Sequence, residues 1–461
     1  MSVGRLVAGV AGLNSVYLVV GYCLLTPFLR RGVASAASYA GLALLIGAGW
    51  TGVLLCIAAV AGATTGVLTF ALVAAGVAGA GLLSRRLVRR PPATPEPAAR
   101  RQRPWEDVVA TAAAAGLVAI AGFALVGGFR SSPWLDDTWG WWVPKGLVLS
   151  SHGLVPGLWQ GSWGFIWISP DYPLWWSSLS ALDLRFVGGI DLRAIDAQLT
   201  ILVLAFLGAL ARLLWGHVRP WLLWPGLALV AAMPELFRQA QGGGGDVPLA
   251  VYLALYCVCA VLWLVRRDPL VLVGAFTFAA AAVQIKSEGA PQLLVLTAVV
   301  SLLGLRAGLR PLLRLWSAVP VALALAAPWF AWRSTHHVHG DFALGRALDP
   351  SYLSSRTSRV RPAVHALGEH LISPRQWILA VPLLVALALL VALRERSWPP
   401  LVLPLVVAVD FFFWVWVNWS DPQDLHYRLS TSAYRVVDTA ALVSAAFVPL
   451  VAERLVSRAP P

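Results

Sequence analysis

The chain has 461 residues, of which 59% are hydrophobic and only 12% are charged, and its mean hydropathy is +0.73. Soluble globular proteins carry roughly 25% charged residues, so these few charges cannot cover the water-exposed surface of a chain this long, and a soluble fold is excluded. The net charge of +13 is explained by basic cytoplasmic loops that orient membrane helices, and we expect no nucleic-acid partner.

Apolar stretches recur from end to end and predict an all-α, polytopic membrane protein of about 13 spans, each near the 20 residues that a bilayer-crossing helix needs. We interpret the first stretch as a retained helix rather than a cleaved signal peptide. All four cysteines lie inside apolar stretches, so neither a disulfide framework nor a thiolate metal site is expected. The expected spans are residues 8–28, 38–61, 65–84, 107–128, 196–214, 220–237, 247–265, 269–285, 289–305, 311–331, 376–393, 399–418 and 434–452.

The segment RRLVRRPPATPEPAARRQRP, residues 85–104, is a basic, Pro/Ala-rich stretch typical of a linker. It predicts a boundary between an N-terminal three-span extension at 1–84, a basic cytoplasmic linker at 85–105 and a membrane core at 106–461. With the linker in the cytoplasm, the arginine clusters of the other short loops fall on the same side.

This topology places the N-terminus outside and the C-terminus in the cytoplasm, in the plasma (inner) membrane of a bacterial-type cell. The long polar loops then face the periplasm or exterior. Residues 172–188 are too short for a span, and their tryptophans predict a juxtamembrane helix lying along the outer interface. The long outer loops are about 129–195, 238–246, 332–375 and 419–433.

The first outer loop contains an acid pair, Asp136 and Asp137, followed by an aromatic segment with Trp139, Trp142 and Lys145. Such a block predicts either a functional polar shelf just above the bilayer or, more simply, a tryptophan belt with solvated acids. The sequence leaves these two interpretations open.

Lysine usage bears on this choice, because Lys145 and Lys286 are the only lysines among 35 basic residues. Both fall in outer segments beside acids, and Glu288 follows Lys286 by two positions. Charged groups at the end of a span are costly unless they are paired or wetted by a cavity. We therefore expect a Lys286–Glu288 pair in a lined pocket, where a lysine could hold a phosphate as a point charge.

Further polar residues follow in the later outer segments. Asp246 ends a glycine tract at a helix start, where it is either an N-cap carboxylate or a site residue. Arg435 stands at the start of the last span, either pairing with Asp438 one turn later or binding an anion. Asp410 lies inside an aromatic span as a buried partner of a base or as a pocket residue.

Several chemistries lack their sequence signatures. The tract at 336–339, His-His-Val-His, has no distant matching ligand set, so we expect no metal there. The chain contains no P-loop, no dinucleotide fingerprint, no HExxH and no GxSxG elbow. A nucleotide-dependent enzyme is therefore not expected.

In order and sidedness these motifs resemble the multi-spanning family C glycosyltransferases, which use polyprenyl-phosphate sugars. The likeness is closest to bacterial relatives of protein O-mannosyltransferases and of lipid A aminoarabinose transferases, and it covers about 106–461. Its motifs are D-T-W-G-W-W-V-P-K-G at 137–146, S-P-D-Y-P-L at 169–174, G-D-V-P-L-A at 245–250, K-S-E-G at 286–289 and S-A-Y-R at 432–435. The chain departs from the family where Ser169 replaces a common His and in its three additional spans.

The resemblance implies an inverting glycosyltransferase that moves a sugar from a polyprenyl phosphate to an acceptor hydroxyl of a glycan, lipid or protein. It implies Asp137, or Asp136, as general base. Positive charge for the donor phosphate would come from Arg435, Lys286 and Lys145. No cofactor is expected, although a divalent metal is optional in the family. The residues expected at the acceptor and sugar are Trp139, Trp142, Asp171, Tyr172, Asp246, Glu288 and His426.

Two other functions fit the composition. A transporter or flippase for lipid-linked glycans predicts paired charges deep in several spans, where the sequence offers mainly Asp410. A non-catalytic assembly or sensor subunit predicts that the outer loop only binds a partner.

Overall fold

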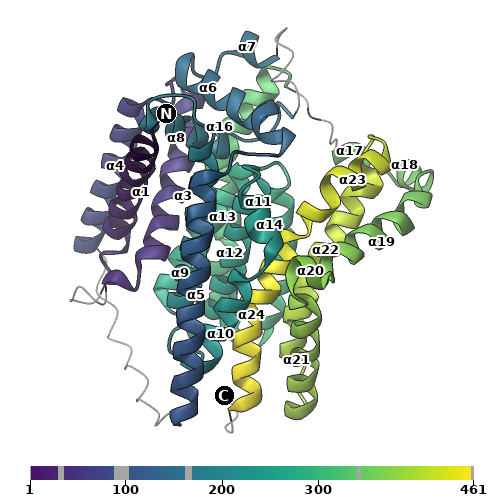
Figure 1. Ribbon diagram of the computed structural model, residues 1–461. Helices are drawn as coiled ribbons and strands as arrows, with labels where there is room; N and C mark the ends of the chain where they lie inside the picture. The colour runs from purple at the N-terminus through teal and green to yellow at the C-terminus, as the bar shows by residue number, and fades with distance from the viewer. Residues whose placement is uncertain are drawn as a thin grey trace.

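The computed structural model of this chain describes residues 2–29, 36–87, 103–160, 169–338, 340 and 344–457. Within these ranges the chain is helical, without β-strands, and its long helices run side by side in one bundle (Figure 1). Ten described helices are long and apolar enough to cross a membrane, or eleven if one bent pair counts as a single span. The protein is therefore a multi-pass membrane protein.

The candidate spans are α1 (Val3–Leu25), α3 (Ala40–Val60), α4 (Val67–Leu87), α5 (Pro104–Arg130), α9 (Arg193–Leu214), α12 (Asp246–Arg266), α14 (Gly289–Ala307), α15 (Leu309–Trp316) with α16 (Ala318–Thr335), η3 (Pro399–Leu401) with α22 (Val402–Ser420), and α23 (Leu425–Val436) with α24 (Asp438–Val456). The bent pair is α10 (Pro220–Ala231) with α11 (Pro234–Ala240). The other helices are the π-helix η1 (Thr138–Trp142), α6 (Val143–Ser151), α7 (Pro156–Gln160), α8 (Trp175–Val187), α13 (Pro269–Ile285), α17 (Leu344–Ala347), α18 (Pro350–Ser354), the 3-10 turn η2 (Thr357–Arg359), α19 (Val360–Leu371), α20 (Pro374–Trp377) and α21 (Ala380–Glu395).

Each of the thirteen expected segments contains a helix, but three of them fall short of a full span. The α10–α11 pair bends by 52°. Helices α13 and α21 have 17 and 16 residues, which at 1.5 Å per residue gives about 25 Å against a hydrocarbon core of about 30 Å. The predicted number of thirteen spans therefore stays a prediction.

Helix starts follow local chemistry. Proline occupies the first turn of α5, α10, α11 and α13, where its missing N–H costs nothing. The Asp268 carboxylate accepts a hydrogen bond from the backbone N–H of Leu270 at 2.9 Å and caps α13. Asp424 caps α23 in the same way through the N–H of Tyr427, also at 2.9 Å.

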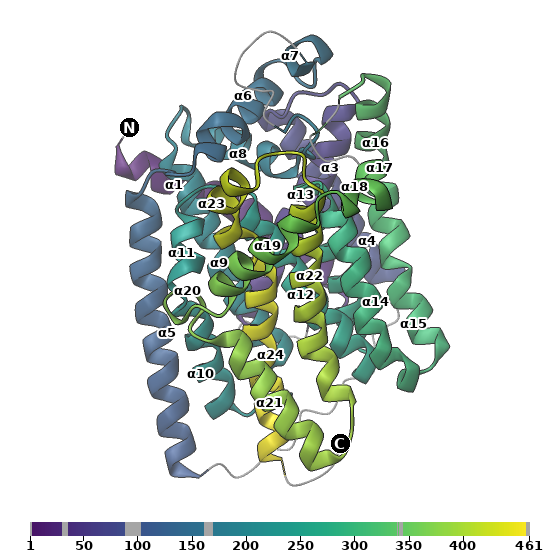
Figure 2. The same cartoon turned by 90° about the vertical axis from the view of Figure 1, so that its right-hand side faces the viewer.

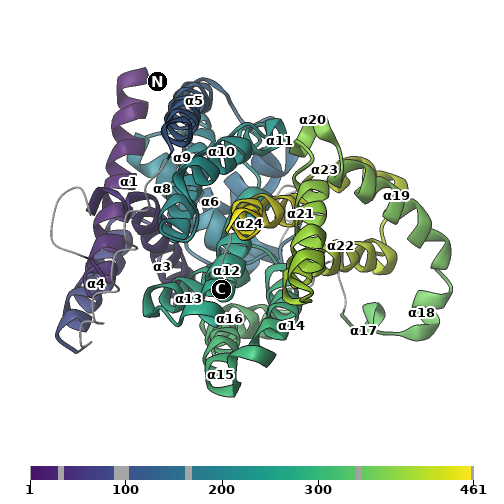
Figure 3. The same cartoon turned by 90° about the horizontal axis from the view of Figure 1, so that it is seen from below.

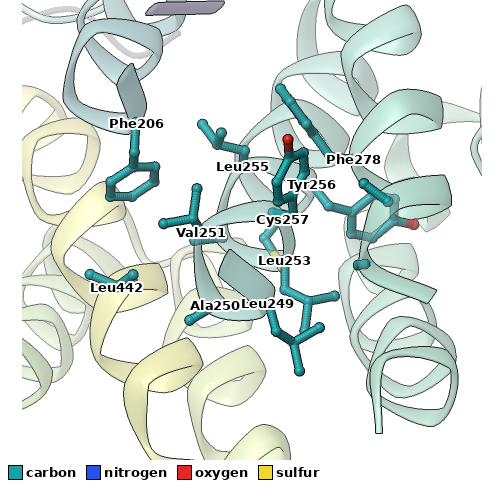
Figure 4. Packing of buried hydrophobic residues seen from close by; sticks show 14 of the residues in the cluster. Phe206, Leu249, Ala250, Val251, Leu253, Leu255, Tyr256, Cys257, Phe278 and Leu442 are labelled. Carbon is teal, nitrogen blue, oxygen red and sulfur yellow. The ribbon is translucent and has the colours of Figure 1, made fainter. Parts of the chain in front are cut away.

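Helix α12 lies at the centre of the bundle and is apolar on every side. It packs against α9, α13, α14 and α24, and its window of 18 residues is completely buried. Figure 4 shows Phe206, Phe278 and Leu442 from three of these neighbours around it. A helix that is apolar all round belongs inside such a bundle. By contrast, α5 leaves Phe123 82% exposed, as a lipid-facing helix does.

The three N-terminal helices share the core of the rest of the molecule. Asn14 on α1 and Gln198 on α9 exchange two amide hydrogen bonds, 2.8 and 3.1 Å long, and both side chains are buried. The indole N–H of Trp50 on α3 donates to the hydroxyl of Thr277 on α13 at 2.9 Å. Most of the predicted linker, residues 88–102, lies outside the described residues.

The end of the bundle that holds Asp137 and Asp246 is called the site end below. The first long loop caps it with η1, α6 and α8, while the C-terminus lies at the opposite end (Figure 1). Seen from the side and from below, α17 to α20 form a wing beside α22 and α23 (Figures 2 and 3).

Helix α8 confirms the short helix expected within 172–188, but its tryptophans do not line an interface. Trp175 and Trp176 are fully buried. The indole of Trp176 donates to the carbonyl of Gly243 at 2.9 Å, and Trp175 packs edge-on to Tyr252 of α12. These side chains therefore pack inside the protein.

Candidate functional site

A cavity of about 660 Å³ opens at the site end, between η1, the first turns of α12 and α14, and helices α22 and α23. Nine of the twelve predicted site residues line it. They are Asp136, Asp137, Trp139, Asp171, Tyr172, Asp246, Lys286, Glu288 and Arg435.

The glycine tract before α12 brings the two central acids together. The hydroxyl of Thr138 donates to the carbonyl of Gly242 at 2.6 Å, and Trp176 bonds the next carbonyl, that of Gly243. Gly243 has a φ of +76°, which favours glycine. The tract is thus tied to the residue that follows Asp137, and it delivers Asp246 to the same wall of the cavity.

Asp137 is paired across 298 positions with Arg435. The Arg435 Nη1 lies 2.6 Å from Asp137 Oδ2, and both side chains are largely buried. Burial raises the pKa of the Asp137 carboxyl above its usual range, although Arg435 works against the shift. Among the described residues no hydrogen bond involves the other oxygen, Oδ1, so it remains free to accept one from a ligand.

Asp246 links Arg435 to Lys286. Its Oδ1 accepts from Lys286 Nζ at 2.6 Å, and its Oδ2 lies 3.7 Å from Arg435 Nη1. The expected Lys286–Glu288 pair is present but longer, at 4.0 Å. Burial disfavours the Lys286 ammonium, yet Asp246 and Glu288 outweigh it and hold the pKa of Lys286 above its usual value. Asp246 is therefore a buried ion-pair partner; the N-cap of α12 is Gly245, without a side-chain cap hydrogen bond, so the N-cap interpretation of Asp246 is wrong.

A second group of polar residues adjoins Lys286, whose Nζ lies 5.3 Å from the ring centroid of Tyr172. Tyr172 donates its hydroxyl hydrogen to Glu288 at 3.2 Å. Ser287 bonds the carboxylate of Asp171 at 3.1 Å, and Arg333 lies 3.7 Å from that carboxylate. Burial raises the pKa of Asp171 despite the nearby Lys145 and Arg333.

Lys145 does not reach the cavity, contrary to its predicted contact with a phosphate. Its side chain is fully buried and lies between the rings of Trp142, Trp159 and Tyr172, 5.6 to 5.8 Å from each centroid. Its ammonium donates to the carbonyl of Ser169. Burial lowers the pKa of Lys145 to about 7, although Asp171 opposes the shift.

Trp142 and His426 also lie off the cavity wall. Trp142 is buried and stacks on Tyr172 with centroids 5.5 Å apart, so it supports the wall from behind. His426 is exposed on the first turn of α23 and is not among the residues of the wall. Exposed Asp136 lines the rim and has no ion-pair partner among the described residues.

Arg435 lies near the end of α23, before a break at Val437, and pairs with Asp137 and Asp246; Asp438 instead accepts from the amide of Gln239 at 3.0 Å. These contacts exclude the pairing of Arg435 with Asp438, and binding of an anion by Arg435 stays a prediction. Asp410 accepts from the amide of Gln292 at 2.9 Å and is buried in the bundle. Among the described residues, Asp410 is neither the partner of a base nor a residue of the cavity wall.

Arg428 is a cavity residue outside the predicted site residues, although its segment, residues 426–442, also carries Arg435. It precedes Arg435 by seven residues, two helical turns, so both side chains project from the same face of α23. Asp421, the residue after α22, lies 3.4 Å from its Nε. The i, i+7 spacing of Arg428 and Arg435 could have predicted that both line the same site. It does so only if residues 425–436 form a helix beside the cavity, as they do here.

Within the described ranges no group of three or more His, Cys, Asp or Glu side chains could hold a metal ion. His339 lies outside these ranges, while His336 stacks on Trp332 with centroids 4.5 Å apart. All four cysteines are free thiols.

Comparisons with known proteins return no matching family model, no similar curated protein and no similar solved structure.

Proposed function

We propose that the protein is an integral membrane glycosyltransferase that moves a sugar from a polyprenyl-phosphate donor to an acceptor hydroxyl at the outer face of the plasma membrane. One observation carries the proposal. A carboxylate with a raised pKa and three cations line one cavity, whose remaining wall includes Phe413 and Val417 of the apolar span α22. This combination suits a ligand with an anionic head and an apolar tail.

In this mechanism Asp137 is the general base. Its Oδ1 accepts the proton of the acceptor hydroxyl as the acceptor oxygen bonds to the anomeric carbon of the sugar. The bond between that carbon and the phosphate oxygen breaks on the opposite face, so the configuration inverts and the lipid phosphate leaves with the electron pair. The raised pKa of Asp137 makes it a stronger base than an exposed aspartate.

The leaving phosphate needs positive charge rather than an acid. Arg435 and Lys286 place two cations on the wall beside Asp137 and Asp246, and such fixed charges stabilise developing negative charge in a site with little water. Trp139 at the rim, 53% exposed, offers an aromatic face to a sugar ring. The number of thirteen spans and the outward-facing site belong to this proposal. They are supported by the described arginines at the ends of α4, α12, α14 and α21, opposite the site end.

The test measures release of decaprenyl phosphate from a panel of decaprenyl-phosphate hexoses and pentoses by the protein in nanodiscs, with simple alcohol acceptors. This product is the same for every sugar. Asp137→Asn should lower turnover by about 100-fold to 10,000-fold, the usual contribution of a general base. Asp136→Asn is the matched control, because it makes the same chemical change on the same rim without a partner to lose, and it should retain turnover.

Full turnover in Asp137→Asn would refute the assignment of the base. Movement of an intact lipid-linked glycan across vesicles, without covalent transfer, would instead support the transporter. The cavity does not favour the transporter hypothesis, because the charged residues that line it lie at one end of the bundle and not along its length.

A further inference from the structure

The three cations of the cavity differ in how far their charge is already neutralised. Lys286 has Asp246 at 2.6 Å and Glu288 at 4.0 Å. Arg435 has Asp137 at 2.6 Å and Asp246 at 3.7 Å. Each of these two cations therefore faces two carboxylates, and a phosphate that contacted either one directly would have to displace a buried partner.

Arg428 is neutralised less. Among the described residues Asp421 is the one carboxylate within 4 Å of its guanidinium, and the approach is through Nε at 3.4 Å, while Glu288 acts on it from a greater distance. Neither terminal nitrogen, Nη1 or Nη2, makes a hydrogen bond to the described residues, and the side chain is 21% exposed on the cavity wall. These two nitrogens are the atoms that bind a phosphate in forked geometry.

The carboxylate that lies 3.4 Å from Arg428 Nε is held in place before any ligand arrives. Asp421 is buried, and its other oxygen, Oδ1, accepts from the backbone N–H of Gln423 at 2.8 Å. The carbonyl of Asp421 accepts from Arg356 in the wing at 2.6 Å. Asp421 is thus fixed both at its carboxylate and at its backbone, so Arg428 has a positioned ion-pair partner, which lowers the entropic cost of binding.

The surroundings of Arg428 match a lipid phosphate. Two turns along the same helix face, Arg435 contacts Asp137, so an anion at Arg428 lies on the same wall as the proposed base. Phe413 and Val417, on the span that ends just before Asp421, line the same cavity with apolar surface.

We infer that Arg428, oriented by Asp421, makes the direct contact with the phosphate of a prenyl-phosphate lipid. Arg435 and Lys286 attract the same phosphate electrostatically without contacting it. This inference rests on the proposed function and names the anion subsite within it. It assigns the phosphate to a residue outside the predicted set and removes Lys145 from that set.

The test compares binding of decaprenyl phosphate, decaprenol and dioleoyl phosphatidic acid to the full chain in neutral detergent, by ligand-induced thermal stabilisation. The wild-type protein should bind decaprenyl phosphate at least about tenfold more tightly than decaprenol. Arg428→Gln should weaken decaprenyl phosphate binding by about tenfold to a hundredfold, the range of a lost charge-assisted hydrogen bond, and leave decaprenol binding unchanged. Arg361→Gln, on the exposed face of α19, is the matched control and should change neither.

Arg428→Lys provides a second variant that keeps the cation but loses the forked pair of terminal donors, and it should show a smaller loss for the phosphate alone. Arg428→Gln with undiminished preference for the phosphate would overturn the inference while leaving the proposed function standing. A wild-type protein that binds decaprenyl phosphate no better than decaprenol would overturn the proposed donor class as well. Equal binding of phosphatidic acid would show that the subsite recognises the phosphate without the prenyl chain, and would overturn the prenyl-lipid part of the inference.

Discussion

Asp246 holds two cations at once, and this predicts a specific stability defect in Asp246→Asn. Its side chain and those of Lys286 and Arg435 are each at most 9% exposed. With an effective dielectric constant of about 20, the Lys286–Asp246 contact at 2.6 Å has a gross attraction of roughly 6 kcal/mol, and the Lys286–Glu288 contact at 4.0 Å has roughly 4 kcal/mol. Asparagine removes the first attraction, and only Glu288 still balances Lys286.

Removing one partner of a buried pair costs about 3–5 kcal/mol, because the other charge is left uncompensated. We expect the lower end, about 3 kcal/mol, since Glu288 remains beside Lys286. Taking roughly 2 °C per kcal/mol for a large chain, the melting temperature should fall by about 6 °C. A thiol-reactive dye can follow unfolding, because Cys56, Cys257 and Cys259 are buried free thiols.

A double variant separates charge from packing. Asp246→Asn with Lys286→Met removes both charges and should recover at least about 1 kcal/mol relative to Asp246→Asn alone. Asp136→Asn, exposed and unpaired, should leave the melting temperature unchanged. If the loss of unfolding free energy in the double variant equals the sum of the losses in Asp246→Asn alone and Lys286→Met alone, the two charges do not compensate each other and the reasoning fails.

Two further predictions concern parts of the molecule away from the cavity wall. Burial lowers the pKa of Lys145 to about 7, against about 10.4 in an unfolded chain, so the unfolded state binds the extra proton between these values. Stability attributable to Lys145 should therefore rise with pH across this window by up to about 1.4 kcal/mol per unit. The stability of wild type relative to Lys145→Met should follow this slope, and a flat difference would contradict it. Asn14→Leu should lower the free energy of unfolding by about 1–2 kcal/mol, because it leaves the buried amide of Gln198 without its hydrogen-bond partner. Adding Gln198→Leu should show a favourable coupling of about 1 kcal/mol between the two changes. Additive losses in the double variant would contradict the paired-amide contact between α1 and α9.

Much of the candidate site was predictable because its residues sit at predictable ends of apolar stretches. Asp246 and Lys286 each adjoin such a stretch, and Asp137 lies in the loop after another. Helix ends that point the same way gather at one end of a bundle, so these residues were expected to share one face. The partners could not be predicted in this way, since Asp246 lies forty positions from Lys286 and Arg435 almost three hundred from Asp137.

Lys145 shows most clearly where prediction from the sequence ends. Its spacing from Asp137 places it on the same segment, but the π-turn of η1 and the start of α6 rotate it behind Trp142. A single turn of helix decides whether a side chain enters a cavity or an aromatic cage, and that turn depends on packing against α8 and the 169–172 segment. Arg428 shows the converse, since its role follows from the helix that carries it beside the cavity.

The amino-acid sequence was enough to predict that lipid surrounds this protein and that its fold is helical, because the transfer of each apolar stretch into lipid depends on composition and length alone. It also determined which end of each helix carries charge. The packing of the helices was needed to show that one connected group contains Asp137, Arg435, Asp246 and Lys286, and that Lys145 lies outside it. This difference arises because partition into lipid is a local property of the chain, whereas the pairing of buried charges depends on which helices pack together.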